Sequence, residues 1–222
     1  MELIPSETSL VVAGAWNAAI LTPGWMMQHA FQKPLEEQGR VQVFLPALQG
    51  AVFEFPRYVL DNMSYIVRPD ALVVAPNESS TELLTLSEDA VIRIVSVLSH
   101  TPITGIGHNF EFRDLNPTPA SLAVFTESRQ DLVDQMPQGW IPSGAAIVAT
   151  FNDEADTVHV NVQRQWDGAA VNVKFNFHHP VSSSEQARAV LDGSNGYRRM
   201  AGNLELAQKL INRIYSGDSK DE

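Results

Sequence analysis

Three segments in the second half of the chain alternate between mostly apolar and mostly polar residues. Successive side chains of a β-strand point to opposite faces of a sheet, so this period-two pattern predicts strands with one buried and one open face. The inward set consists of Ile106, His108, Phe110 and Phe112 in 104–113, of Val158, Val160 and Val162 in 157–166, and of Val171, Val173, Phe175 and Phe177 in 169–179. The alternation therefore predicts an antiparallel sheet that helices cover on one side.

The outward set of the same strands is rich in side-chain amides. Such amides are either simply solvated or form a hydrogen-bonding surface that docks a partner or ligand. We predict the second role for Asn109, Glu111, Arg113, His159, Asn161, Gln163, Asn172, Lys174 and Asn176. No residue of the chain is assigned a catalytic or metal-binding role.

The same order of elements occurs twice along the chain. The first half reads as a strand over 9–16, a helix beginning at the Thr22–Pro23 pair, three β-rich segments and a helix over 87–100. The second half reads as a strand over 104–113, a helix beginning at Thr118 and Pro119, three strands and two closing helices. Thr followed by Pro is a helix-start signal, because Thr caps the first turn and Pro lacks an N–H that would be unpaired there.

We therefore predict an α+β fold with two pseudo-repeats of β-α-β-β-β-α. The first repeat covers 1–100 and the second 101–216, with a flexible acidic tail over 217–222. The two repeats are expected to form one compact unit, a curved antiparallel sheet with helices on one face. This order resembles the duplicated TATA-binding-protein-like topology, and no DNA-binding function follows from that resemblance.

The first half is apolar on both predicted faces of its strands. Val41, Val43 and Leu45 alternate with Gln42 and Phe44. An apolar second face is expected to be covered by another subunit, so we predict a homodimer. The next β-rich segment, 51–60, contains Pro56, which predicts that this segment is an edge strand or is bent at the proline.

Composition excludes several functional classes. The net charge of −11 disfavours nucleic acid as a partner, because the field of the protein repels phosphates. The absence of cysteine removes disulfides and thiolate chemistry. No apolar run is long enough for a membrane span, and the acidic N-terminal segment lacks the features of a signal peptide, so we expect a cytoplasmic protein.

The motifs of the chain favour structure over chemistry. Gly105-Ile-Gly107 lacks the third glycine and the helix that a dinucleotide fingerprint requires, so it predicts close packing within a strand. His108 falls on the inward face, and neighbouring His178 and His179 point to opposite faces and cannot chelate one ion together. We therefore expect no cofactor.

The segment "HTPITGIGHNFEFRDL" resembles the hallmark of a sporadically distributed family of uncharacterised bacterial proteins. In that family a Gly-x-x-Tyr-x-Asn-like strand follows the central helix; here Phe110 replaces the tyrosine. The closing segment "NLELAQKLINRIY" is similar to the last helix of those proteins. The resemblance implies a bacterial or phage origin and supplies no catalytic residues.

Two functions are consistent with these features. The first is a non-enzymatic binding or assembly protein that docks a protein partner on the open sheet face. The alternative is a small-molecule-binding protein or enzyme, with a polar pocket on that face formed by Asn109, Glu111, Arg113, His159 and Asn161. Trp140, in a loop rich in Pro and Gly, is the best candidate for an exposed anchor in either case.

Overall fold

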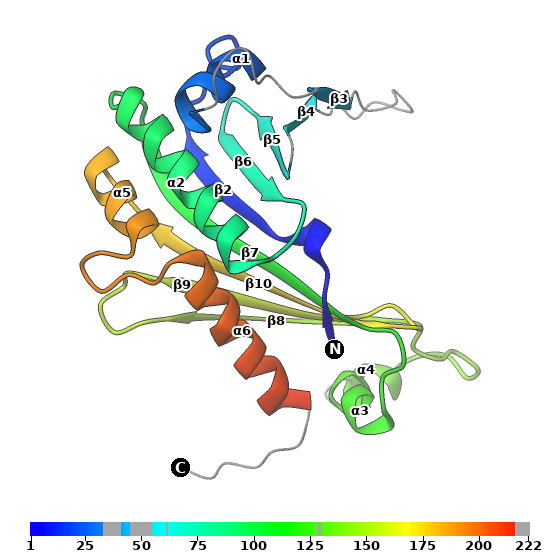
Figure 1. Ribbon diagram of the computed structural model, residues 1–222. Helices are drawn as coiled ribbons and strands as arrows, with labels where there is room; N and C mark the ends of the chain where they lie inside the picture. Colours follow the sequence, from blue (N-terminus) through cyan, green and yellow to red (C-terminus); the bar gives the residue numbers. More distant parts are fainter. Residues whose placement is uncertain (33–40, 45–54, 61, 128–129, 216–222) are drawn as a thin grey trace.

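The computed structural model of the 222-residue chain shows one long, curved antiparallel sheet with helices packed on it (Figure 1). It describes residues 1–32, 41–44, 55–60, 62–127 and 130–215. The strands are β1 (Glu2–Leu3), β2 (Ser9–Gly14), β3 (Gln42–Phe44), β4 (Arg57–Leu60), β5 (Met63–Val67), β6 (Ala71–Pro76), β7 (Ile103–Asp114), β8 (Ala145–Asn152), β9 (His159–Trp166) and β10 (Val171–Pro180). The helical segments are η1 (Pro5–Glu7), α1 (Pro23–Trp25), η2 (Met26–Ala30), α2 (Thr81–Val97), α3 (Pro119–Glu127), α4 (Gln130–Val133), α5 (Ser184–Asp192) and α6 (Met200–Tyr215).

The sheet has the order β3-β4-β5-β6-β2-β7-β10-β9-β8, and β1 pairs with one end of β7. The two halves meet at the central β2–β7 pair, and each half of the chain places its last strand beside its first. The first half contributes the five strands β2–β6 and the second half the four strands β7–β10. The predicted α+β class and curved antiparallel sheet are therefore confirmed. A common origin of the two halves stays a prediction.

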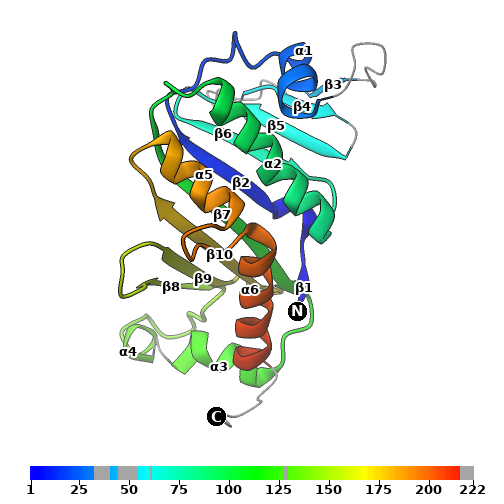
Figure 2. The same cartoon turned by 60° about the vertical axis from the view of Figure 1, so that its left-hand side comes forward.

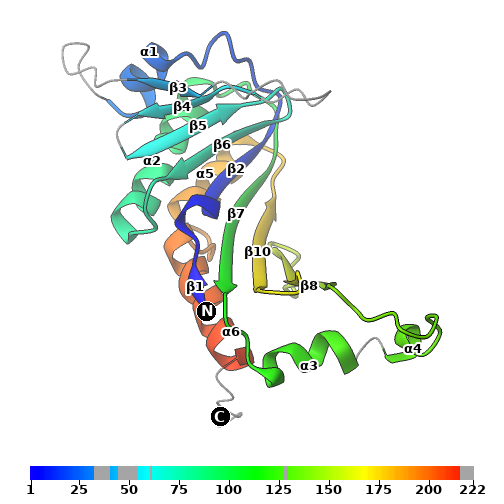
Figure 3. The ribbon, with the colours of Figure 1, turned by 90° about the vertical axis from the view of Figure 1, so that its right-hand side faces the viewer.

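The helices α2, α5 and α6 lie on one face of the sheet, as predicted (Figures 1 and 2). The short segment η2 packs on α2, where the Arg93 guanidinium donates a 2.7 Å hydrogen bond to the Ala30 carbonyl. The helices α3 and α4 depart from this layer. Figure 3 shows that they form an arm that begins below α6 and projects toward the helix-free side of the sheet.

The core lies between the sheet and the helix layer, and it includes most of the predicted inward residues. Phe110 and Phe177 meet edge to face with ring centroids 6.0 Å apart, and Phe112 and Phe175 do so at 5.9 Å. This is a preferred geometry for aromatic pairs. Val158, Val160 and Val162 are only partly buried, because the helices cover the β9–β8 end of the sheet incompletely.

Two predicted helix starts are confirmed and one is wrong. The Thr22 and Thr118 hydroxyl oxygens accept hydrogen bonds from backbone N–H groups three residues later, at 3.4 and 3.2 Å. The helix predicted over 87–100 instead begins at Thr81, with Ser80 as its cap, and ends at Val97. Ser87 lies inside α2, where its hydroxyl donates to the Leu83 carbonyl. Ser87 followed by Glu88 and Asp89 has the residue types of a helix start, so local sequence placed the start of this helix too late.

The apolar first-half strands lie partly outside the described residues. Leu45 cannot be placed for that reason, whereas Val43 and Phe44 at the β3 edge are 50% and 55% exposed. Pro56 precedes β4, which pairs with β3 and β5, so the edge-strand alternative for this segment is wrong. A bend at Pro56 stays a prediction.

The glycines of β7 make room for side chains of β10. A Cβ atom at Gly105 would overlap the imidazole of His178, and one at Gly107 would lie 3.2 Å from the Asn176 side-chain nitrogen. The prediction of close packing at both glycines is confirmed. The neighbouring strand thus fills the space that a side chain would occupy.

Substituting Gly105→Ala is expected to lower the free energy of unfolding by about 1–3 kcal/mol, the usual cost of overpacking. In a His178→Ala background the same substitution should cost much less, because the overlapping ring is gone. Urea unfolding of the two single variants and the double variant measures this coupling. Gly24→Ala, with open space around it, is the control and should not destabilise. Equal costs in both backgrounds would contradict the packing argument.

Candidate functional site

The nine residues predicted for the ligand or partner face share one surface. Strand pairing sets Asn109 opposite Asn176 and Asn176 opposite Asn161, and it places the other six in parallel rows across β7, β10 and β9. Cross-strand partners lie on the same side of a sheet. This helix-free surface is called the open face below.

Three hydrogen bonds between side chains lie in one cross-strand row of the open face, in which Asn161 and Asn176 are neighbours by strand pairing. Asn161 donates to the Thr150 hydroxyl at 3.0 Å, Asn176 donates to the Asn109 carbonyl oxygen at 2.6 Å, and Asn109 donates to the Ser9 hydroxyl at 3.3 Å. This amide row runs from β8 to β2. Ser9 and Thr150 were missed by the sequence analysis, because membership of the row depends on strand register, which local pattern does not encode.

The charged groups of the open face are also paired. Lys174 Nζ lies 3.1 Å from a Glu111 carboxylate oxygen, and Arg113 lies 3.9 Å from Asp167. The pairing of Glu111 with Arg113 that their spacing allows is replaced by these cross-strand and turn contacts. His159 contacts Asp156 at 2.8 Å, in the turn before β9.

A shallow cavity of about 290 Å³ lies over the amide row. Three of the five residues predicted for a polar pocket line it, namely Asn109, Glu111 and Asn161; Arg113 and His159 do not. Among the lining residues, Asn109 bonds to Ser9 and Asn176, and Glu111 pairs with Lys174. The open face is therefore a preorganised polar surface with weak concavity.

A second polar group lies inside the core, between the two halves of the chain. The fully buried Glu88 of α2 accepts hydrogen bonds from the Met200 N–H at 2.7 Å and from Arg199 Nε at 2.9 Å. Asn203 of α6 lies 2.9 Å from His108 Nδ1, and His108 Nε2 lies 3.7 Å from Glu88. These contacts join α2 to α6 and β7.

Burial shifts the two ionisable groups at the centre of this cluster in opposite directions. It raises the pKa of Glu88 to about 7, outweighing the hydrogen bonds from Met200 and Arg199 that favour the carboxylate. It lowers the pKa of His108 to about 3, with a smaller contribution from the charge of His179. Because neither side chain has exposed surface, the cluster cannot contact a substrate in this conformation and is a structural tie.

Apart from the inward position of His108, nothing in the sequence indicates this cluster. Glu88 lies at the predicted start of the helix over 87–100, and Arg199 and Asn203 carry no local signal. Their partners lie about a hundred positions away in the chain, so only the fold reveals them.

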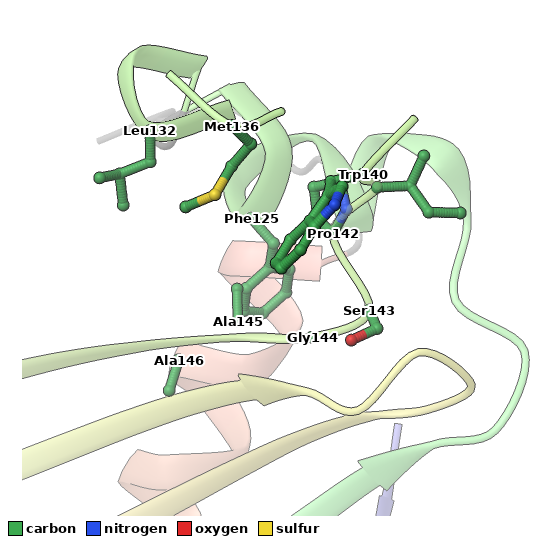
Figure 4. Close-up of a pocket in the computed structure, with 10 residues that line it drawn as sticks. Phe125, Leu132, Met136, Trp140, Pro142, Ser143, Gly144, Ala145 and Ala146 are labelled. Carbon is green, nitrogen blue, oxygen red and sulfur yellow. The ribbon is translucent and has the colours of Figure 1, made fainter. Parts of the chain in front are cut away.

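Apolar side chains gather at the β8 end of the sheet. The arm consists of α3, α4 and the segment that leads from α4 to β8. A cavity of about 460 Å³ above Ala145 is lined by Phe125, Leu132, Met136 and Trp140 of this arm (Figure 4). Trp140 is 68% exposed, which confirms its predicted exposure. The neighbouring Ile141 is 85% exposed.

Strand β8 is the edge strand at this end of the sheet. It pairs with β9 on one side only, within the described residues. Its sequence, AAIVATFN, contains no charged residue and no proline. Val148 and Phe151 are about 60% exposed on its opposite faces, so the edge is apolar on both sides.

Comparison with known proteins found no match. The chain matches no known family model and no curated protein, so the resemblance to the sporadically distributed bacterial family stays an expectation. Every helix in the described ranges is too short or too polar to span a lipid bilayer. Among the same residues, no three His, Asp or Glu side chains lie close enough together to hold a metal ion.

The buried cluster has a defined effect on stability against pH. The fold favours the protonated form of Glu88, so this residue contributes its full share to the free energy of unfolding below its ordinary pKa of 4.5, and the contribution is lost as the pH rises to about 7. The fold favours the neutral form of His108, so this residue contributes its full share above its ordinary pKa of 6.5, and the contribution is lost as the pH falls to about 3. Between pH 4.5 and 6.5 the two changes oppose each other and cancel.

Substituting Glu88→Gln removes the titration of Glu88 and leaves that of His108, so the two pH dependences can be separated. The stability deficit of the variant relative to wild type should be largest near pH 4.5 and shrink by about 3 kcal/mol toward pH 7, at 1.36 kcal/mol per pKa unit. Urea unfolding across that pH range provides the measurement. Glu82→Gln, at an exposed position in the first turn of the same helix, is the control and should change the free energy of unfolding by no more than about 1 kcal/mol at any pH. A deficit independent of pH would show that Glu88 does not titrate in this range.

Proposed function

We propose that the protein is a non-enzymatic binding and assembly protein that pairs with a second copy of itself through β8. The observation that carries this proposal is the uncharged, apolar outer edge of β8. Natural sheets protect exposed edges with charges, prolines or bulges, and an edge without them is a template for another strand. The second copy supplies that strand.

The sequence of β8 is self-complementary in an antiparallel pair centred on Ala149. That register sets Phe151 of one copy opposite Ile147 of the other on the helix-side face. On the open face it sets Val148 opposite Thr150. Cross-strand pairs of aromatic with β-branched residues, and of β-branched residues with each other, each contribute roughly 0.2–1 kcal/mol.

Charge favours this edge over other surfaces of the molecule as the self-contact. Each copy carries a net charge of −11, so two copies repel at long range. None of that charge lies on β8 itself. The arm, with exposed Trp140 and Ile141, lies beside the Ala145 end of β8, so an added strand passes an aromatic anchor of the kind that dominates interface energies.

The dimer would join two open faces into one larger amide-rich surface, on which a protein partner docks. Two features support binding over catalysis. The polar side chains of the amide row are engaged with one another, and the strongly shifted groups, Glu88 and His108, are sealed in the core. A binding protein with this surface has no need of a cofactor.

Substituting Val148→Lys should separate the two copies, because a charge would then face the apolar edge of the partner. Light scattering at micromolar concentration should give twice the 24.5 kDa chain mass for wild type and the single-chain mass for the variant. Val97→Lys is the matched control, since Val97 is 53% exposed at the end of α2, far from β8 in the fold. It should stay dimeric.

Raising the salt concentration should tighten the wild-type dimer by screening the repulsion between copies. A wild-type protein with the mass of one chain at micromolar concentration would refute the proposal. So would a Val148→Lys variant that stays dimeric.

A further inference from the structure

A groove runs along α6, between this helix and the incompletely covered end of the sheet. Its volume is about 500 Å³, within the range of about 300–1,000 Å³ typical of small-molecule sites. One wall consists of Leu206, Leu210 and Ile214 of α6. The other consists of apolar side chains of β8, β9 and β10, among them Val160 and Val162. Leu206, Leu210 and Ile214 lie on one face of α6, and this face borders the groove.

Arg164 is the one charged residue among the groove's lining residues. Its guanidinium lies 5.2 Å from the ring centroid of Tyr215 and 5.7 Å from that of Phe125, and its Nε donates to the Tyr215 hydroxyl at 3.0 Å. Within the described part of the chain no carboxylate pairs with it. The two aromatic rings hold the guanidinium in place, and its Nη groups remain to bind an anion.

The strand register places this charge at one end of the groove. Arg164 lies opposite Ile147 and Val173, whereas Val160 lies opposite Phe151 and Phe177. The four-residue step from Arg164 to Val160 along β9 corresponds to roughly 13 Å. The groove therefore has an apolar length with a single cation at one end.

We propose that this groove binds a single-chain amphiphile with a carboxylate head, of the chemical class of fatty acids. The carboxylate pairs with the Arg164 guanidinium, which matches its planar geometry. The alkyl chain lies along Leu206 and Leu210 over the valines of β9, where burial of each methylene group is favourable. This site is separate from the open face, and it borders the proposed dimer contact at Ile147 and Phe151.

Calorimetric titration with decanoate and with decanol separates the contribution of the head group from that of the chain. Wild-type protein should bind decanoate at least tenfold more tightly than decanol, the order expected for charge-assisted hydrogen bonds. Arg164→Met keeps an unbranched side chain for packing and should abolish that preference while decanol binding persists. Arg213→Met, an exposed position on α6, is the matched control and should leave the preference unchanged.

A second variant guards against misfolding of Arg164→Met. Ile214→Asp, at a 43% exposed position of the groove wall, should reduce binding of decanoate and decanol together. The titration repeated on Val148→Lys should match wild type, which keeps this result independent of the dimer. Equal affinity for decanoate and decanol in wild type would overturn the carboxylate assignment. Absence of binding, or binding unaffected by Ile214→Asp, would overturn the site.

Discussion

The central strand β7 is the constraint on which the rest of the structure depends. It pairs with β2 of the first half along one edge and with β10 of the second half along the other. Its inward side chains belong to a single core that extends from Leu10 to Ile211. The predicted repeats, 1–100 and 101–216, therefore share one core, and separating them would expose two strand edges and divide that core. The buried tie between Glu88 and Arg199 reinforces the same junction from the helix side.

The glycines of β7 couple this constraint to the open face. Because Gly105 and Gly107 lack side chains, His178 and Asn176 of β10 lie over the backbone of β7. Asn176 is thereby positioned to donate to Asn109 and continue the amide row into the first half. Backbone packing at the centre of the sheet thus determines the polar surface above it. Larger residues at these glycines would disturb both.

The sequence predicted what depends on local periodicity and missed what depends on distance along the chain. The inward and outward faces of β7, β9 and β10 followed from period two, because side-chain direction in a strand is a local property. The start of α2 did not follow, since the acidic residues after Ser87 resemble a cap whereas Glu88 is held by residues of α6. For the same reason the nine open-face residues were predicted, but their hydrogen-bond partners Ser9 and Thr150 were not. The groove required the spatial relation of α6 to β9, which no periodicity contains.

The distribution of satisfied and unsatisfied groups distinguishes the surfaces of the molecule. On the open face, amides and charges are largely paired with one another, so a partner there must exchange existing hydrogen bonds for new ones of similar strength. At the β8 end the sheet continues into no further strand within the described ranges, and large apolar side chains are exposed. Covering these side chains removes apolar area from water. The exposed apolar side chains at the β8 end are therefore better suited to supply affinity for the proposed second copy, and the open face is better suited to discriminate between partners.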